Sequence, residues 1–162
     1  MEFIERNDKI GIVAPKVLNP NKTVQDTRCR WPKFYTFLYR RTFLSKTRFG
    51  KEHLNHYLYK DIDIEKEMKV DWSFGCCFLI KTQVFNDVGL FDERFFLFLE
   101  ETDLCRRMWQ HDYEVWYLPI AETVHYPQRR TTGNGTIKDL FSKYTWIHLW
   151  SWFKYFWKWR GV

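Results

Sequence analysis

The segment that most constrains the fold is residues 70–107, which read VDWSFGCCFLIKTQVFNDVGLFDERFFLFLEETDLCRR. Its first part, residues 70–80, is almost continuously apolar and predicts a mostly buried strand. A short helix at residues 82–88 and a Phe-rich loop follow, and acidic residues then begin a second helix over residues 100–111, where negative charge suits the positive end of the helix dipole. This order of elements brings carboxylates to the end of a buried scaffold, where a general base can be positioned.

The acidic first turn of that second helix has two interpretations. Glu101 follows apolar residues 97–99 and lies between Glu100 and Asp103, and crowded like charges in a poorly solvated site raise pKa values, as a general base requires. The alternative is structural: acids in a first turn satisfy backbone N–H groups and the dipole, and Asp103 forms an i, i+4 pair with Arg107. From the acids alone, the structural interpretation is favoured.

The rest of the chain adds further strands and helices. Strands are predicted at residues 10–14 and 113–118, and a long aromatic helix at residues 137–160. Strands and helices mixed in this way predict an α/β fold. With 162 residues, the chain is long enough to bury the core that such a fold requires.

The predicted helix at residues 137–160 is amphipathic and, with the last two residues, forms a separate unit at residues 137–162. On a helical wheel, one side collects Asp139, Lys143, Ser151, Lys154 and Lys158, and the opposite side collects Phe141, Leu149, Trp152, Phe153, Phe156 and Trp159. Lysines interrupt any spanning segment, and Trp and Tyr favour the headgroup boundary of a bilayer. We therefore expect this helix to lie along a membrane surface, with packing onto a half of the protein that is absent from this sequence, or onto a partner chain, as the alternative.

Charge is distributed unevenly along the chain. The formal net charge is +6, and residues 126–162 hold seven basic residues and one acidic residue, whereas residues 1–125 hold nineteen of each. This favours a local contact of the tail with an anionic surface. Residues 27–51 contain eight basic residues, many aromatics and no acid, which also suits single-stranded nucleic acid. No nucleic-acid-binding motif is present, however, so we expect no nucleic-acid partner.

Targeting signals and cysteine spacing bear on location. The N-terminus, MEFIERNDK, has no apolar core of a signal peptide, and no run of 18 apolar residues occurs. The four cysteines lack C-x-x-C spacing and are expected to be reduced thiols. We expect a cytoplasmic protein, peripheral on the inner face of the cell membrane.

Three motifs within residues 70–107 carry a family resemblance. They are DWSFGCCFLI at residues 71–80, GLFDERFF at residues 89–96 and EETDL at residues 100–104. They resemble the D-W-x-x-G-A-x-x-L-I, G-x-F-D-E-x-F-F and E-D-x-D-L motifs in the acceptor-side half of the family 2 glycosyltransferases, in particular the rhamnosyltransferase-like members. The resemblance covers about residues 10–135. It implies that residues 1–136 are part of a GT-A domain, a Rossmann-like mixed sheet with flanking helices.

The resemblance assigns roles to the acidic turn. In these enzymes the second acid of the E-D pair is the catalytic base, and this position is Glu101, a Glu where the family usually has Asp. One extra methylene displaces the carboxylate by about an ångström, which matters for catalysis. Glu100 would orient the site, and Asp103 would cap or brace it.

The resemblance also implies a binding site around the base. Trp72 and Gly75 fall in the region that lines the acceptor pocket, with a core Trp as an equal alternative. His125 matches a V-x-H position that often binds the divalent ion, Mg²⁺ or Mn²⁺, and Arg129 and Arg130 suit the donor diphosphate. From the residues alone, His125 is a polar residue at a strand end and the two arginines belong to a solvated loop.

Together these features imply an inverting glycosyltransferase that moves a sugar, such as a rhamnosyl or hexosyl group, from a nucleotide-sugar donor to a polysaccharide or lipid-linked acceptor. The nucleotide-binding strand and the D-x-D-type motif of the family's first half are not found in the sequence. We therefore expect a fragment or one half of a split enzyme, inactive alone, with a separate chain as a candidate source of the donor-binding half. The alternative is a non-catalytic membrane-surface or protein-interaction module built around the aromatic tail.

Overall fold

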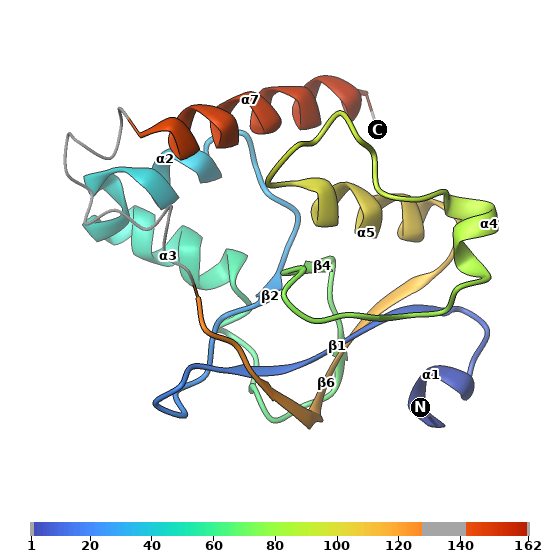
Figure 1. The fold of residues 1–162 in the computed structure, drawn as a ribbon. Coiled ribbons are helices and arrows are strands. Elements are labelled where there is room, and N and C mark those ends of the chain that lie inside the picture. Colours follow the sequence, from blue (N-terminus) through green and yellow to red (C-terminus); the bar gives the residue numbers. More distant parts are fainter. Residues whose placement is uncertain (1, 128–141, 162) are drawn as a thin grey trace.

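The computed structural model describes residues 2–127 and 142–161 (Figure 1). In chain order the elements are α1 (Glu2–Glu5), β1 (Ile10–Leu18), β2 (Arg28–Cys29), α2 (Thr36–Arg41), the 3₁₀ helix η1 (Phe43–Lys46), α3 (Arg48–Tyr57), β3 (Met68–Lys69), β4 (Trp72–Ser73), β5 (Leu79–Ile80), α4 (Val84–Val88), α5 (Glu100–Gln110), β6 (Glu114–Val124) and α7 (Lys143–Lys158).

The described strands form two sheets. The larger has the order β3-β6-β1-β5, in which β1 and β6 are parallel and the two short outer strands are antiparallel to their neighbours. The smaller sheet pairs β2 with β4. Helices flank the mixed sheet (Figure 1), so the predicted α/β class with a mixed sheet is confirmed.

The main core lies between the sheet and α5. On α5, Leu104 and Met108 are fully buried, four residues apart on one face of the helix, and they pack with Ile12 of β1 and Val115 of β6. Gly11 permits this close approach, since a Cβ there would lie 3.0 Å from the Tyr113 Cβ. The sheet therefore fixes the position of α5 and of the acidic turn with which it begins.

The strand predicted at residues 70–80 is not continuous, and this prediction was wrong. β4 and β5 belong to different sheets, and a turn at residues 75–76 separates them. The turn passes beneath the start of α5, where a Cβ on Gly75 would lie 3.4 Å from the Glu101 Cβ. An apolar run alone does not reveal such a turn, because its apolar side chains serve two separate packing surfaces.

α7 packs against the body of the protein along one face. Trp152, Tyr155 and Trp159 are buried against Phe37 of α2 and Leu99 before α5, and Figure 1 shows α7 lying across α2 and the loop that leads into α5.

The helical wheel is corrected in part by this packing. Ser151, predicted on the polar side, is buried and donates a hydrogen bond to the Leu97 carbonyl at 2.8 Å, while Phe153 is 51% exposed. The helical-wheel assignment of Ser151 and Phe153 was wrong because the helix buries a face that contains both polar and aromatic residues and leaves other aromatic residues exposed to solvent. Residues 137–141 of the predicted helix lie outside the described residues. Within residues 2–127 and 142–161, none of the helices has the length and apolar character needed to cross a membrane.

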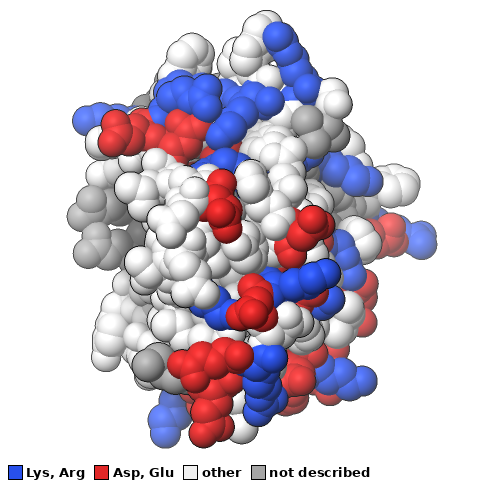
Figure 2. Space-filling view, turned by 90° about the vertical axis from the view of Figure 1, so that its right-hand side faces the viewer, with Lys and Arg blue, Asp and Glu red and all other residues white. Residues whose placement is uncertain are grey.

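Acidic and basic side chains alternate over the face that carries α4 and α1 (Figure 2). Ion pairs between described residues include Lys69 with Glu114 at 2.7 Å and Lys81 with Asp8 at 3.6 Å. This face therefore carries both positive and negative charges, which agrees with the equal numbers of basic and acidic residues in residues 1–125.

Candidate active site

A cleft of about 430 Å³ lies between α2, the turn after β4, the start of α5 and α7. Five residues proposed from the sequence line it: Trp72, Gly75, Glu100, Glu101 and His125. They come from three separate stretches of the chain, and the fold brings them to one cavity.

The loop that leads into α5 has a strained backbone. Phe98 and Leu99 have φ angles of 69° and 68°, in the left-handed region that non-glycine residues rarely adopt. Each such residue costs about 1–3 kcal/mol, and residues of this kind gather at functional sites. The Leu99 side chain is 4% exposed and packs with Trp152 of α7, so burial holds the strained turn. The turn places Glu100 and Glu101 in the wall of the cleft.

Glu101 is a desolvated carboxylate within this wall. Its Oε2 atom is buried without a hydrogen-bond partner among the described residues, and the same holds for Glu100 Oε2. Burial, followed by the charge of Glu100, raises the pKa of Glu101 to about 8, while Arg40 and the Gly75 amide act in the opposite direction. Burial also raises the pKa of Glu100. A carboxylate with a raised pKa, facing an open cavity, is suited to accept a proton.

Asp103 lies away from the cleft. Its side chain is fully buried, and its oxygens are 2.9 Å from Arg107 Nε, 2.6 Å from Lys158 Nζ and 2.9 Å from Trp159 Nε1. The i, i+4 pair with Arg107 is thus present, and α7 supplies the other two partners. Asp103 thus ties the start of α5 to the end of α7 and does not line the cleft.

Trp72 and Gly75 form one wall of the cleft. The Trp72 indole is only 3% exposed, donates a hydrogen bond to the Arg30 carbonyl at 3.0 Å and stacks on Phe74 with ring centroids 5.4 Å apart. It offers little free face for a sugar ring, so its burial fits the core alternative. Gly75 lies directly against Glu101 and keeps that wall thin.

His125 lines the cleft from the end of β6. Its amide donates to the Leu18 carbonyl at 2.9 Å, and its Nδ1 lies 3.1 Å from Gln25 Oε1. Among the residues that the structure describes, no three His, Cys, Asp or Glu side chains are grouped so that they could hold a metal ion. Arg129 and Arg130 lie outside the described residues.

Three basic side chains also line the cleft and were missed as site residues: Arg40, Arg41 and His148. Arg41 Nη2 lies 2.6 Å from His148 Nδ1, and since arginine only donates, the imidazole nitrogen accepts. Burial, then the charges of Arg41 and Arg40, lower the pKa of His148 to about 2, so the ring is neutral. The arginine pair was visible within the basic residues 27–51, whereas nothing in the sequence of α7 marks His148 as a cleft residue.

Comparison with known proteins adds a family relationship. No protein-family model matches the chain. The chain is 35% identical over 85 residues to the N-acetylglucosaminyl-diphospho-decaprenol L-rhamnosyltransferase of Mycobacterium tuberculosis, covering 51% of the chain and 27% of that protein. It is 29% identical over 112 residues to the rhamnosyltransferase WbbL of Escherichia coli, covering 69% of the chain and 36% of that protein.

A third relative is the low-salt glycan biosynthesis hexosyltransferase Agl10 of Haloferax volcanii, 24% identical over 75% of the chain and 35% of that protein. The chain thus spans between 27% and 36% of the length of the relatives it matches. The resemblance to rhamnosyltransferase-like glycosyltransferases is confirmed over about half of the chain.

Proposed function

We propose that this chain provides the acceptor-binding and catalytic-base portion of an inverting glycosyltransferase, which transfers a sugar from a nucleotide-sugar donor to a polysaccharide or lipid-linked acceptor. The observation that carries the proposal is the Glu101 carboxyl group, which lines an open cleft with one buried oxygen that has no partner among the described residues. The relatives support it, since their names denote rhamnosyl and hexosyl transfer. The M. tuberculosis relative also supports a lipid-linked acceptor, because its name specifies a diphospho-decaprenol.

In this proposal Glu101, in its ionised form, accepts the proton of the acceptor hydroxyl while the hydroxyl oxygen attacks the anomeric carbon. The new C–O bond forms as the bond to the donor diphosphate breaks, and the diphosphate leaves with its electron pair. A single displacement of this kind inverts the anomeric centre and needs only one base. Burial, followed by the charge of Glu100, keeps the pKa of Glu101 high enough for the carboxylate to be an effective base near neutral pH.

A divalent ion would neutralise the departing diphosphate when bound. His125 is the cleft residue that the family resemblance suggests as a ligand for it, and among the described residues no three His, Cys, Asp or Glu side chains are grouped so that they could hold a metal ion. The proposed mechanism of this chain therefore includes no metal-dependent step, and Mg²⁺ or Mn²⁺ is proposed as a cofactor of the whole enzyme.

The test is the Glu101→Gln variant, with Glu93→Gln as a control, since Glu93 is an exposed acid in the loop before α5. Transfer is measured with the chain alone and with a donor-binding domain supplied in trans. Glu101→Gln should lower turnover about 10²–10⁴-fold, because the amide keeps the shape but cannot take the proton. In the unchanged protein, kcat/KM should rise with pH up to about 8, the pKa of Glu101. If the turnover of Glu101→Gln is within a few-fold of that of the unchanged protein, a residue other than Glu101 is the base.

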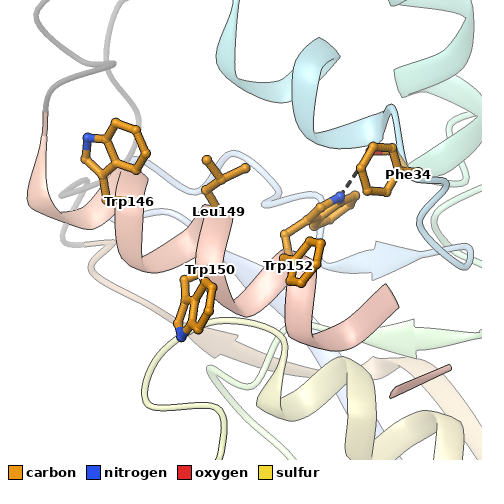
Figure 3. A pocket seen from close by; sticks show the side chains of 6 residues that line it. Phe34, Trp146, Leu149, Trp150 and Trp152 are labelled. Atoms are coloured by element: carbon orange, nitrogen blue, oxygen red, sulfur yellow. Dashed lines mark hydrogen bonds between the residues drawn. The ribbon is translucent and has the colours of Figure 1, made fainter. Parts of the chain in front are cut away.

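We also propose that the protein binds the inner face of the cell membrane through the outer surface of α7. This surface carries an apolar groove of about 370 Å³ lined by Phe34, Trp146, Leu149, Trp150, Trp152 and Phe153 (Figure 3). The Trp152 indole points inward and donates to the Phe34 carbonyl at 3.0 Å, whereas Trp146 and Trp150 are about 60% exposed. No acid occurs in α7, so the groove suits an anionic bilayer interface.

The same surface favours a second candidate function, a non-catalytic membrane-surface module. The two candidates differ in one measurement. If no sugar transfer appears under any donor supply and vesicle binding persists, the second function replaces the first.

A further inference from the structure

The two arginines at the end of α2 neither donate nor accept a proton in the transfer proposed above. Arg40 and Arg41 form the last turn of α2, and both line the cleft that contains Glu100 and Glu101. Neighbouring guanidinium groups in a cavity are typical of sites that bind phosphate groups, because their N–H donors match phosphate oxygens in pairs.

Aromatic and imidazole rings hold the two side chains. The Arg40 guanidinium carbon lies 5.8 Å from the Tyr57 ring centroid and 5.5 Å from that of Phe74, and such contacts orient a cation without neutralising it. Arg41 donates to the neutral ring of His148 at 2.6 Å. These contacts place both guanidinium groups at the cleft.

Two of the other titratable groups of the cleft carry little charge near neutral pH. Burial, followed by the charge of Glu100, raises the pKa of Glu101 to about 8. His148 contributes no charge of its own, because burial and the nearby arginines lower its pKa to about 2. The guanidinium groups of Arg40 and Arg41 add two permanent cations to this end of the cleft.

We infer that Arg40, with Arg41 beside it, binds the diphosphate group of a substrate in the cleft. The inference rests on the proposed function, since both substrates proposed there can carry a diphosphate: the nucleotide-sugar donor and a lipid-linked acceptor.

The position of the pair favours the acceptor. α2 and α7 lie against each other, with Phe37 of α2 in ring contact with both His148 and Trp152. His148 borders the cleft, whereas Trp152 and Phe34 border the apolar groove. A diphosphate joined to a prenyl chain can therefore place its anionic group at Arg40 and its chain along the same pair of helices, whereas a nucleotide has no apolar tail to bury there.

The test is equilibrium binding to the full chain with three probes: farnesyl diphosphate, UDP and inorganic pyrophosphate. Arg40→Gln should weaken farnesyl diphosphate binding by about tenfold or more, as loss of a charge-assisted hydrogen bond predicts. Arg48→Gln is the matched control, because Arg48 is 87% exposed on α3 and pairs with Glu52 at 3.0 Å outside the cleft. Trp150→Gln should weaken farnesyl diphosphate binding and leave pyrophosphate binding unchanged.

Each result has a defined meaning, provided that thermal melting confirms that the variants are folded. If Arg40→Gln weakens binding of UDP and leaves farnesyl diphosphate unchanged, the acceptor assignment is overturned and the diphosphate belongs to the donor. If Arg40→Gln has the same affinity as the unchanged protein for all three probes, Arg40 does not bind a diphosphate. The proposed site is also overturned if the unchanged protein binds none of the probes. Binding is measured without sugar transfer, so these results do not depend on the Glu101→Gln assay, whose failure would refute the proposed function separately.

Discussion

Glu101 and Asp103 stand two residues apart at the start of α5, yet their surroundings are opposite. Asp103 is completely buried and has three cationic or N–H partners, two of them from α7. Glu101 has a buried oxygen without a partner among the described residues and a pKa raised to about 8. Residues two apart on a helix point to different sides, so one carboxylate faces α7 and the other faces the cleft.

The difference shows that two acids of one helical turn can have opposite effects on the stability of the folded state. The paired carboxylate stabilises the contact between α5 and α7, while the desolvated Glu101 carboxylate destabilises the folded state in its ionised form, which suits the role proposed for it. The comparison predicts that changes at the two positions move stability in opposite directions.

The largest effect on stability is expected at Asp103. Asp103→Asn removes the negative charge and leaves Lys158 and Arg107 without their shared partner, and breaking a buried pair in this way costs about 3–5 kcal/mol. Urea denaturation at pH 7 measures the loss in free energy of unfolding. Glu101→Gln should show no loss in the same experiment, so equal destabilisation by both changes would break the comparison.

A smaller effect is expected in the pH dependence of stability. The pKa of Glu101 is raised in the folded state, so its stabilising contribution is fully present below about pH 4.5, the ordinary value, and is lost as pH rises through about 8. The free energy of unfolding should therefore decline over this range, and Glu101→Gln should remove that part of the decline. Asp92, whose pKa is lowered mainly by Arg94 and also by Lys158, acts with the opposite sign and only at acid pH.

Subtraction of the two pH profiles isolates the Glu101 contribution. If the unchanged protein and Glu101→Gln have parallel profiles between pH 5 and 8, the Glu101 carboxyl is not desolvated and the contrast with Asp103 disappears.

The smallest effect is expected on the outer side of α7. Lys158 is directed inward, 2.7 Å from Asp92 and 2.6 Å from Asp103, whereas Lys154 and Arg160 lie beside the exposed Trp150 and Trp157. Lys154→Gln and Arg160→Gln should each weaken binding to anionic vesicles by about 1 kcal/mol, measured by flotation, with weaker binding in high salt.

Lys51→Gln on α3 is the control for loss of an exposed positive charge. Lys158→Gln should lower thermal stability instead, because its charge serves the buried acids. A double variant, Lys154→Gln with Arg160→Gln, should float less than Lys51→Gln. If the two proteins float equally, this face has no membrane role.

The amino-acid sequence by itself determined the local elements and the position of the acidic turn. Helix α5 begins at Glu100 as predicted, because its apolar spacing and first-turn acids are local signals. The pair between Asp103 and Arg107 followed from i, i+4 spacing. The family resemblance identified which carboxylate to consider as the base.

Only the tertiary structure decided which acid is paired and what else faces the cleft. Lys158, Trp159 and His148 reach their partners across 45 or more residues of sequence, and local spacing carries no information about such contacts. The break at residues 75–76 arises because the chain must pass beneath Glu101. Burial without a partner is what raises the pKa of Glu101, and burial is a property of the assembled fold, in which distant segments exclude water from the same carboxylate.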